Sequence, residues 1–375
     1  MMVIRIGCGG KPKSVPNFRR IVQRLQWSAK PNRVLGFGAE ETMRAACVLL
    51  FITLAVVPIA VSQSTPNRVL LALSKQDHTL AIVDPTSLKV LARVPVGPDP
   101  HEVIASTDGK TAYVSIYGFG GYHALSVVDL VNQKALPEVD TGALNGPHGL
   151  AFSGGNVWFT AEGAKAIARF DPATSKIDWI MGTGQNRTHM LYVTTDEKRI
   201  YTTNVSSGTV SLIEQVATPS PGGQQHTDWN ETVIAVGKGD EGFDVSPEGR
   251  QLWTANAQDG TISIIDLANK QVTATLDAKI ASANRLKFTP DGKYVLVSML
   301  REGNVAVFDA ASHKEVRRIP IGHGAAGILM DPAANRAFVA CTPDNSVAII
   351  DLTTWKVTGH LEVGGGPDGL AWAAR

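Results

Sequence analysis

Seven short segments of this sequence end alike, with an alternating apolar pattern closed by an acidic residue, as in DGTISIID. The closing residues are Asp84, Asp129, Asp171, Glu214, Asp266, Asp309 and Asp351. Successive ones lie 45, 42, 43, 52, 43 and 42 positions apart, so only the step from Glu214 to Asp266 is long. A repeat of about 40–45 residues with strand-like content is typical of propeller blades. The repeat therefore constrains the fold more than any other feature.

The content of each repeat predicts four strands. Turn sequences such as SPEGR and TPDGK, flanked by β-branched and aromatic residues, are typical of hairpins. Residues 68–96 supply three strands but lack the innermost one, and residues 369–373 supply only an innermost strand. Joining these two segments completes a seventh blade and closes the ring. The sequence therefore predicts an all-β chain, a seven-bladed β-propeller of four-stranded antiparallel blades.

The strand sequences also carry a family resemblance. AYVSI, IYTTN and LWTAN, followed by SGTVSLI or DGTISIIDL, resemble the YVTN repeats of YncE-like propellers over about residues 66–375. This resemblance implies the propeller fold. It leaves the activity open, because the superfamily includes binding proteins, lactonases, lyases and haem enzymes, and a fold does not determine a function.

A charge-free apolar run, residues 45–61, follows Arg44 and ends in the small residues Ala60-Val61-Ser62. A basic start, an apolar core and a small-residue exit are the parts of a secretory signal. The alternative is an uncleaved anchor, since about 17–25 apolar residues can span a bilayer. We expect a basic lead over 1–42, a signal peptide or anchor over 43–62, and a propeller over 63–375 that is exported, either released (periplasmic or secreted) or anchored outside the cytoplasm.

The charge distribution bears on both the start of the chain and its partners. Residues 1–44 contain nine Lys and Arg against two acidic residues, and the remainder contains 26 basic against 32 acidic residues. The first 42 residues are either a long basic lead or lie upstream of a true start at Met43, and we favour the second. The acidic balance of the folded part argues against nucleic acid as a partner, because phosphate binding needs a basic surface.

The opening residue of each innermost strand is expected to face the central channel. The residues at this position are His101, His148, His189, Glu241, Asn284, Ala326 and Asp368. Four consecutive blades thus offer three imidazoles and a carboxylate, a ligand set for a divalent transition metal. We predict a metal site at His101, His148, His189 and Glu241. The alternative is that the repeat itself scatters solvated histidines around the ring.

Two arginines and two polar ring residues extend this prediction to a ligand. Most blades have glycine after the ring residue, but this chain has Arg285 after Asn284, and Arg187 lies just before His189. A guanidinium can hold a carboxylate in a bidentate fork. We predict that Arg187, Arg285, Asn284 and Asp368 bind a small anionic ligand.

An enzyme at the same channel is the second hypothesis. The segment GPHGLAFSGGNVWFTAEG, residues 146–163, resembles a blade of virginiamycin B lyase, which uses His and Glu near a metal. Lactonase and muconate-cyclising propellers use His, Glu and Arg, and His148, Glu241 and Arg285 match these by type. The resemblance implies a lactone hydrolase or lyase acting by metal assistance or acid–base catalysis.

A protein-interaction scaffold is the third hypothesis. Residues 215–232 (QVATPSPGGQQHTDWNET) account for the long repeat and predict a surface loop insertion. Long loops of this kind are often functional. Such a scaffold would bind a protein partner through its outer loops.

Overall fold

The computed structural model of this protein describes residues 65–219 and 225–375. The predicted lead (1–42) and signal or anchor (43–62) lie outside the described residues. Within the described ranges, none of the helices has the length and apolar content that a bilayer crossing requires.

The described residues form seven sheets, each of four antiparallel strands. The innermost strands are β4 (Pro100–Ala105), β8 (Pro147–Ser153), β12 (Thr188–Val193), β16 (Asp240–Val245), β20 (Ala283–Phe288), β24 (Ala325–Asp331) and β28 (Pro367–Ala374). The second strands are β1 (Arg68–Ser74), β5 (Thr111–Ile116), β9 (Asn156–Ala161), β13 (Arg199–Asn204), β17 (Gln251–Asn256), β21 (Tyr294–Met299) and β25 (Arg336–Cys341). The third strands are β2 (Thr79–Asp84), β6 (Ala124–Asp129), β10 (Ala166–Asp171), β14 (Thr209–Pro219), β18 (Thr261–Asp266), β22 (Asn304–Asp309) and β26 (Ser346–Asp351). The outer strands are β3 (Lys89–Pro95), β7 (Lys134–Asp140), β11 (Lys176–Gly182), β15 (Gln225–Ala235), β19 (Gln271–Asp277), β23 (Lys314–Pro320) and β27 (Lys356–Leu361). Two 3-10 turns, η1 (Gly118–Gly120) and η2 (Thr342–Asp344), complete the described elements.

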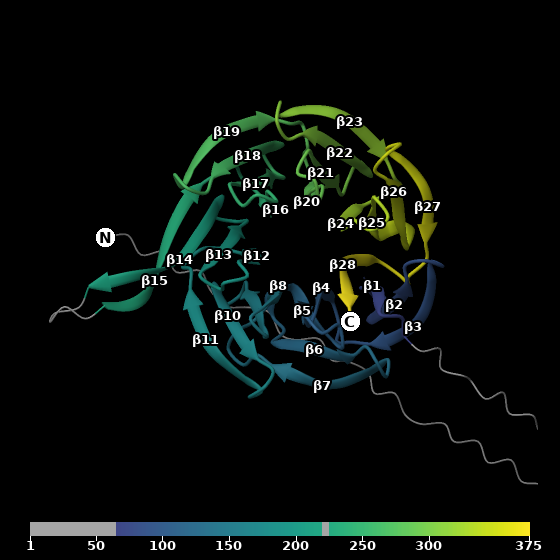
Figure 1. The fold of residues 1–375 in the computed structure, drawn as a ribbon, viewed down its shortest axis with the longest axis horizontal. Coiled ribbons are helices and arrows are strands. Elements are labelled where there is room, and N and C mark those ends of the chain that lie inside the picture. Colours follow the sequence, from purple (N-terminus) through teal and green to yellow (C-terminus); the bar gives the residue numbers. More distant parts are fainter. Residues whose placement is uncertain (1–64, 220–224) are drawn as a thin grey trace, which may run out of the picture. The chain divides into compact units, whose positions relative to one another are not determined.

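The seven sheets form a closed ring (Figure 1). Each innermost strand contacts the innermost strands of both neighbouring blades, including β28 with β24 and β4. β28 pairs with β1, from Arg68 opposite Ala374 to Ser74 opposite Pro367. The predicted seven-bladed propeller and its closure by the last strand are confirmed.

The repeated acidic residue ends the third strand and stabilises the turn that follows. Asp84 Oδ1 accepts a hydrogen bond from the backbone N–H of Thr86 at 2.9 Å, and Asp351 Oδ1 accepts one from Thr353 at 2.9 Å. A short carboxylate that accepts the backbone N–H two residues on is the Asx turn. Glu214 is the exception because β14 continues past it, so no turn needs to be closed there.

The core lies between adjacent blades, where the middle strands of each sheet are buried on both faces. Trp158 and Trp253 are fully buried there. Apolar packing between sheets supplies most of the stability of such a fold.

The predicted loop insertion over 215–232 is wrong in one respect. β14 and β15 pair without a break from Thr209 opposite Ala235 to Pro219 opposite Gln225. The extra residues lengthen a hairpin, which extends outward from the ring (Figure 1). Extended pairing satisfies the backbone hydrogen bonds that an irregular loop would leave to water.

Candidate functional site

A register shift in every blade aims side chains at the axis. In each innermost strand the pairing with its neighbour slips at the ring residue and the residue after it, as between Pro147 and Leu150 in β8. Such a β-bulge re-aims side chains and frees a backbone group. In β8 the freed N–H of Gly149 donates to Thr160 Oγ1 at 2.9 Å. The ring position is therefore built into the local structure of each blade.

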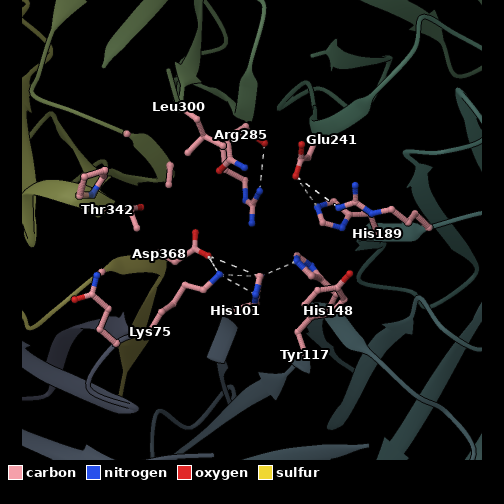
Figure 2. A pocket seen from close by; sticks show the side chains of 17 residues that line it. Lys75, His101, Tyr117, His148, His189, Glu241, Arg285, Leu300, Thr342 and Asp368 are labelled. Carbon is pink, nitrogen blue, oxygen red and sulfur yellow. Dashed lines mark hydrogen bonds and ion pairs between the residues drawn. The ribbon is translucent and has the colours of Figure 1, made fainter. Parts of the chain in front are cut away.

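The bulged residues surround a central cavity of about 530 Å³ (Figure 2). All seven predicted ring positions line it, as do the two predicted arginines, Arg187 and Arg285. The sequence alignment of the repeats thus brings these residues to one place. Their roles as ligands or catalysts stay predictions.

His148, His189 and Glu162 form a buried cluster of potential metal ligands. Each offers one ligand atom, and these atoms lie within 4.8 Å of one another. The imidazole rings of His148 and His189 have their centroids 3.9 Å apart. Glu162, directly after β9, contacts His189 Nδ1 and accepts a hydrogen bond from the Tyr117 hydroxyl at 2.6 Å. The cluster thus contains Glu162, which the sequence prediction lacks, and omits His101 and Glu241.

Glu162 and Glu241 favour the charged form of His189. The His189 side chain is buried, and burial alone would lower the pKa of its imidazole. Its contact with Glu162 and the 3.5 Å distance from its Nε2 to Glu241 Oε1 outweigh that effect and raise the pKa. Burial likewise opposes ionisation of Glu241, but His189 and the arginines hold the pKa of Glu241 at about 2. The two carboxylates therefore favour the protonated form of His189 when no metal is bound.

His148 has the opposite electrostatic environment. It is buried, and burial together with the charges of His189 and His101 lowers its pKa well below the usual range. Its Nε2 lies 3.1 Å from His101 Nδ1, whereas its Nδ1 has no hydrogen-bond partner. A neutral imidazole with an unpaired nitrogen is the form of histidine that binds a metal.

A second charged group lies around His101. Lys75, directly after β1, places its Nζ 2.8 Å from His101 Nε2 and 3.3 Å from Asp368 Oδ2. His101 Nε2 is also 3.1 Å from Asp99 Oδ1, and this contact is the main reason that the pKa of Asp99 falls to about 2. His101 thus joins the His148 cluster to a lysine that lines the cavity (Figure 2).

The two arginines engage carboxylates of the protein. Arg285 Nη2 contacts Glu102 Oε1, from a blade on the other side of the ring. Arg187 has a left-handed backbone (φ 54°), and its Nε lies 3.4 Å from Glu162 Oε2. The Arg285 guanidinium, which we predicted to bind a ligand carboxylate, therefore already contacts a carboxylate of the protein itself.

Sequence reasoning missed Glu162, Tyr117 and Lys75. Glu162 lies within the segment 146–163 that resembles a lyase blade, and this was the only indication of it. His323, two residues before β24, is not among the lining residues. Its side chain is 83 % exposed and pairs with Asp344 at 2.9 Å.

The charges around the cavity do not balance. Five carboxylates either line the cavity or contact a lining side chain: Asp99, Glu102, Glu162, Glu241 and Asp368. Three lining side chains are permanent cations: Lys75, Arg187 and Arg285. With His189 neutral, this set sums to a net charge of −2, which one divalent cation would balance.

Several solved structures resemble the fold of this chain at low sequence identity. A putative 6-phosphogluconolactonase from Bacteroides fragilis is 16% identical with a TM-score of 0.65, covering 83% of this chain and 99% of that one. A functionally unknown protein from Desulfotomaculum acetoxidans is 13% identical with a TM-score of 0.63, covering 80% and 98%. The dihydro-heme d1 dehydrogenase NirN in complex with DHE is 16% identical with a TM-score of 0.58, covering 80% and 64%. At these identities the similarity shows the fold.

One protein-family model matches part of the chain. The model described as the cytochrome D1 heme domain matches residues 147–329, a stretch that includes His148, His189, Glu241 and Arg285. No curated protein matches the chain. The YncE-like resemblance is supported as far as the seven-bladed propeller fold.

Proposed function

We propose that this chain is an exported ligand-binding propeller that holds a divalent transition metal in the wall of its central cavity, beside a site for a small anionic ligand. The cluster of His148, His189 and Glu162 carries this proposal, because three ligand atoms lie within 4.8 Å of one another. Imidazole nitrogen and carboxylate oxygen suit zinc, copper, iron or nickel. The net charge of −2 that the cavity has once His189 is neutral supports a divalent cation.

The surrounding residues fit such an ion. His148 Nδ1 is a buried nitrogen without a hydrogen-bond partner, and a metal would relieve the cost of leaving it unpaired. His189 Nε2 has only the long 3.5 Å contact with Glu241 Oε1. Tyr117 fixes one oxygen of Glu162, the kind of contact that orients a metal ligand. When bound, the ion would supply a Lewis acid that attracts an anion. Arg187, Arg285, Asn284 and Asp368 would then orient that anion.

The same residues fit a haem group less well. A haem iron needs an imidazole that faces an open, flat space. The His148 ring instead has His101, Tyr117 and His189 packed around it, with centroids 4.9, 5.2 and 3.9 Å away. We therefore propose a bare ion, although the haem-domain family model covers this part of the chain.

A titration tests the metal site. Zinc should bind the metal-free protein at one site per chain by calorimetry, and the variant His148→Ala/Glu162→Ala should lose that site. The matched control His323→Ala/Asp344→Asn removes an exposed histidine–carboxylate pair and should bind like the wild type. Equal binding by wild type and the cavity variant would contradict the proposal.

An acid–base enzyme is the second candidate. His189 between Glu162 and Glu241 is the observation that favours it, since a histidine paired with carboxylates can move a proton. His148 and Glu241 would then act on a lactone or a related substrate, and Arg285 would stabilise the developing anion. Turnover of a lactone panel that disappears in Glu241→Gln would support an enzyme. If the metal-loaded wild type turns over none of these lactones, the ligand-binding function is favoured.

Export remains part of the proposal. The apolar run 45–61 and its small-residue exit support a signal peptide over 43–62 or, alternatively, an anchor. N-terminal sequencing of the native protein tests this. A first residue near Gln63 would support cleavage, and an intact run 45–61 would support the anchored form.

A further inference from the structure

Two charged side chains from distant blades meet across the channel. Glu102 belongs to β4 and Arg285 to β20. The blades of these two strands are three positions apart around the ring in one direction and four in the other. Arg285 Nη2 contacts Glu102 Oε1, and their side chains are 7% and 13% exposed. Figure 2 shows the Arg285 guanidinium directed into the cavity. We call this pair the channel bridge.

The channel bridge leaves donors of Arg285 available. A guanidinium carries five N–H donors in a planar fork. In the described chain, Arg285 uses Nη2 toward Glu102 and Nη1 toward the Asn284 carbonyl oxygen at 3.2 Å. Because Arg285 lines the cavity, a ligand oxyanion can reach the remaining N–H groups.

Asn284 adds an unpaired acceptor at the same place. Its side chain lines the cavity, the residue is 7% exposed, and its Oδ1 has no hydrogen-bond partner. A buried acceptor without a donor is costly, so a ligand hydroxyl directed at this oxygen would be favoured over a ligand without one. The donor and the acceptor come from consecutive residues of β20.

We propose that Arg285 and Asn284 form a subsite for an oxyanion that carries or adjoins a hydroxyl group, and that Glu102 is the positioning residue that holds Arg285 there. This inference rests on the proposed function, because it names the ligand class of the same cavity. Hydroxycarboxylates and hydrogen phosphate share this chemistry.

Glu102 is needed because other carboxylates compete for the guanidinium. Asp368 and Glu241 also line the cavity, and both stabilise the charge of Arg285. Without Glu102, Arg285 would turn toward these two residues, and an internal ion pair would take the place of the ligand.

Paired anions test the subsite. Calorimetry on the zinc-loaded protein compares glycolate with acetate, and hydrogen phosphate with sulfate; only the first member of each pair has a hydroxyl group. We expect the wild type to prefer the hydroxylated member of one pair, and that pair identifies the carboxylate or the phosphate class. Asn284→Ala should reduce the preference about tenfold, while the metal still chelates both anions. Glu102→Gln should weaken both anions about tenfold without loss of zinc.

Met190→Leu is the matched control, because Met190 occupies the equivalent bulged position of β12 without a charge. It should change neither preference nor affinity. A wild type that binds no probe anion or prefers neither member, or an Asn284→Ala variant with the wild-type preference, would overturn the inference. If Glu102→Gln does not fold, Glu102→Gln/Arg285→Met replaces it: loss of anion binding with zinc retained supports the subsite, and retained affinity overturns it. Failure of zinc to bind the wild type would overturn the proposed function instead, and the same titrations on the metal-free protein would then decide the subsite.

Discussion

At the level of single residues, the bulged layer alternates large and small side chains around the ring. The positions after the ring residues are Glu102, Gly149, Met190, Gly242, Arg285, Gly327 and Gly369. A Cβ on Gly149 would lie 2.5 Å from the His189 carbonyl oxygen of the next blade, and one on Gly242 would lie 2.6 Å from Arg285 Cα. Each bulky residue therefore packs against a glycine of the preceding blade. With seven blades the alternation cannot close, and Gly327 and Gly369 are neighbours.

Gly149→Ala should destabilise the protein by about 2 kcal/mol or more, because backbone atoms of β12 would have to move. Gly359→Ala is the control, since a Cβ on Gly359 would meet nothing within 4 Å. Chemical denaturation measures both. Equal stability of the two variants would contradict the close approach of the inner strands.

Asp240 should make stability depend on pH. Burial raises the pKa of its carboxyl from the ordinary 3.8 to about 7, so between these values the folded state keeps a proton that the unfolded state releases. Stability therefore falls as pH rises through this window. Asp240→Asn removes the dependence and should gain up to about 4 kcal/mol relative to wild type between pH 4 and pH 7. The prediction would be contradicted if the free energies of unfolding of the two proteins changed equally with pH.

Metal affinity should depend on pH through His189. Glu162 and Glu241 raise the pKa of this imidazole against the effect of burial, and its proton must leave before a metal binds. Zinc affinity should therefore fall about tenfold per pH unit below that pKa. Calorimetry in buffers of different ionisation enthalpy would detect the released proton. An affinity that is constant from pH 5.5 to 8 would argue against His189 as a ligand.

At the level of strands, the repeat predicts the elements well because each blade uses the same turns and the same pattern of buried side chains. The acidic residue closes a turn, the Asp-Gly sequences form hairpins, and the alternation buries one set of side chains. Glu214 shows the limit: a longer residue at the repeat position coincides with a hairpin that does not turn there. Spacing alone could not distinguish a loop from a longer ladder.

Shortening the long hairpin tests whether it serves the ring. Replacement of residues 216–228 by Asn-Gly keeps Trp229, whose ring centroid lies 5.2 Å from that of Trp179. Because Gln215 and Val216 are exposed, the melting temperature should change by only about 2 °C. Zinc binding should not change. Loss of a protein partner in this variant, with the cavity intact, would instead support the scaffold hypothesis. A variant that does not fold would contradict the prediction that the ring is stable without the outer part of the hairpin.

At the level of the whole molecule, ring closure creates the site. Trp372 of β28 lies under the Arg68 guanidinium at 3.6 Å and donates to the Met330 carbonyl oxygen at 2.8 Å, which ties the last strand to β1 of its own blade and to β24 of the adjacent blade. Alignment of the repeats predicted which residues line the cavity, since every blade repeats the same bulge. It could not predict Lys75, which lines the cavity from the end of β1, or Glu162, which follows β9 and contacts the lining residues His189 and Tyr117 of the adjacent blades.

The metal content of the purified protein tests the central claim most directly. Elemental analysis should find close to one transition metal ion per chain in the wild type and in the control His323→Ala/Asp344→Asn. The variant His148→Ala/His189→Ala should contain none, even after incubation with metal and desalting. No metal in the wild type after the same incubation would contradict the account and leave the histidines as a product of the repeat.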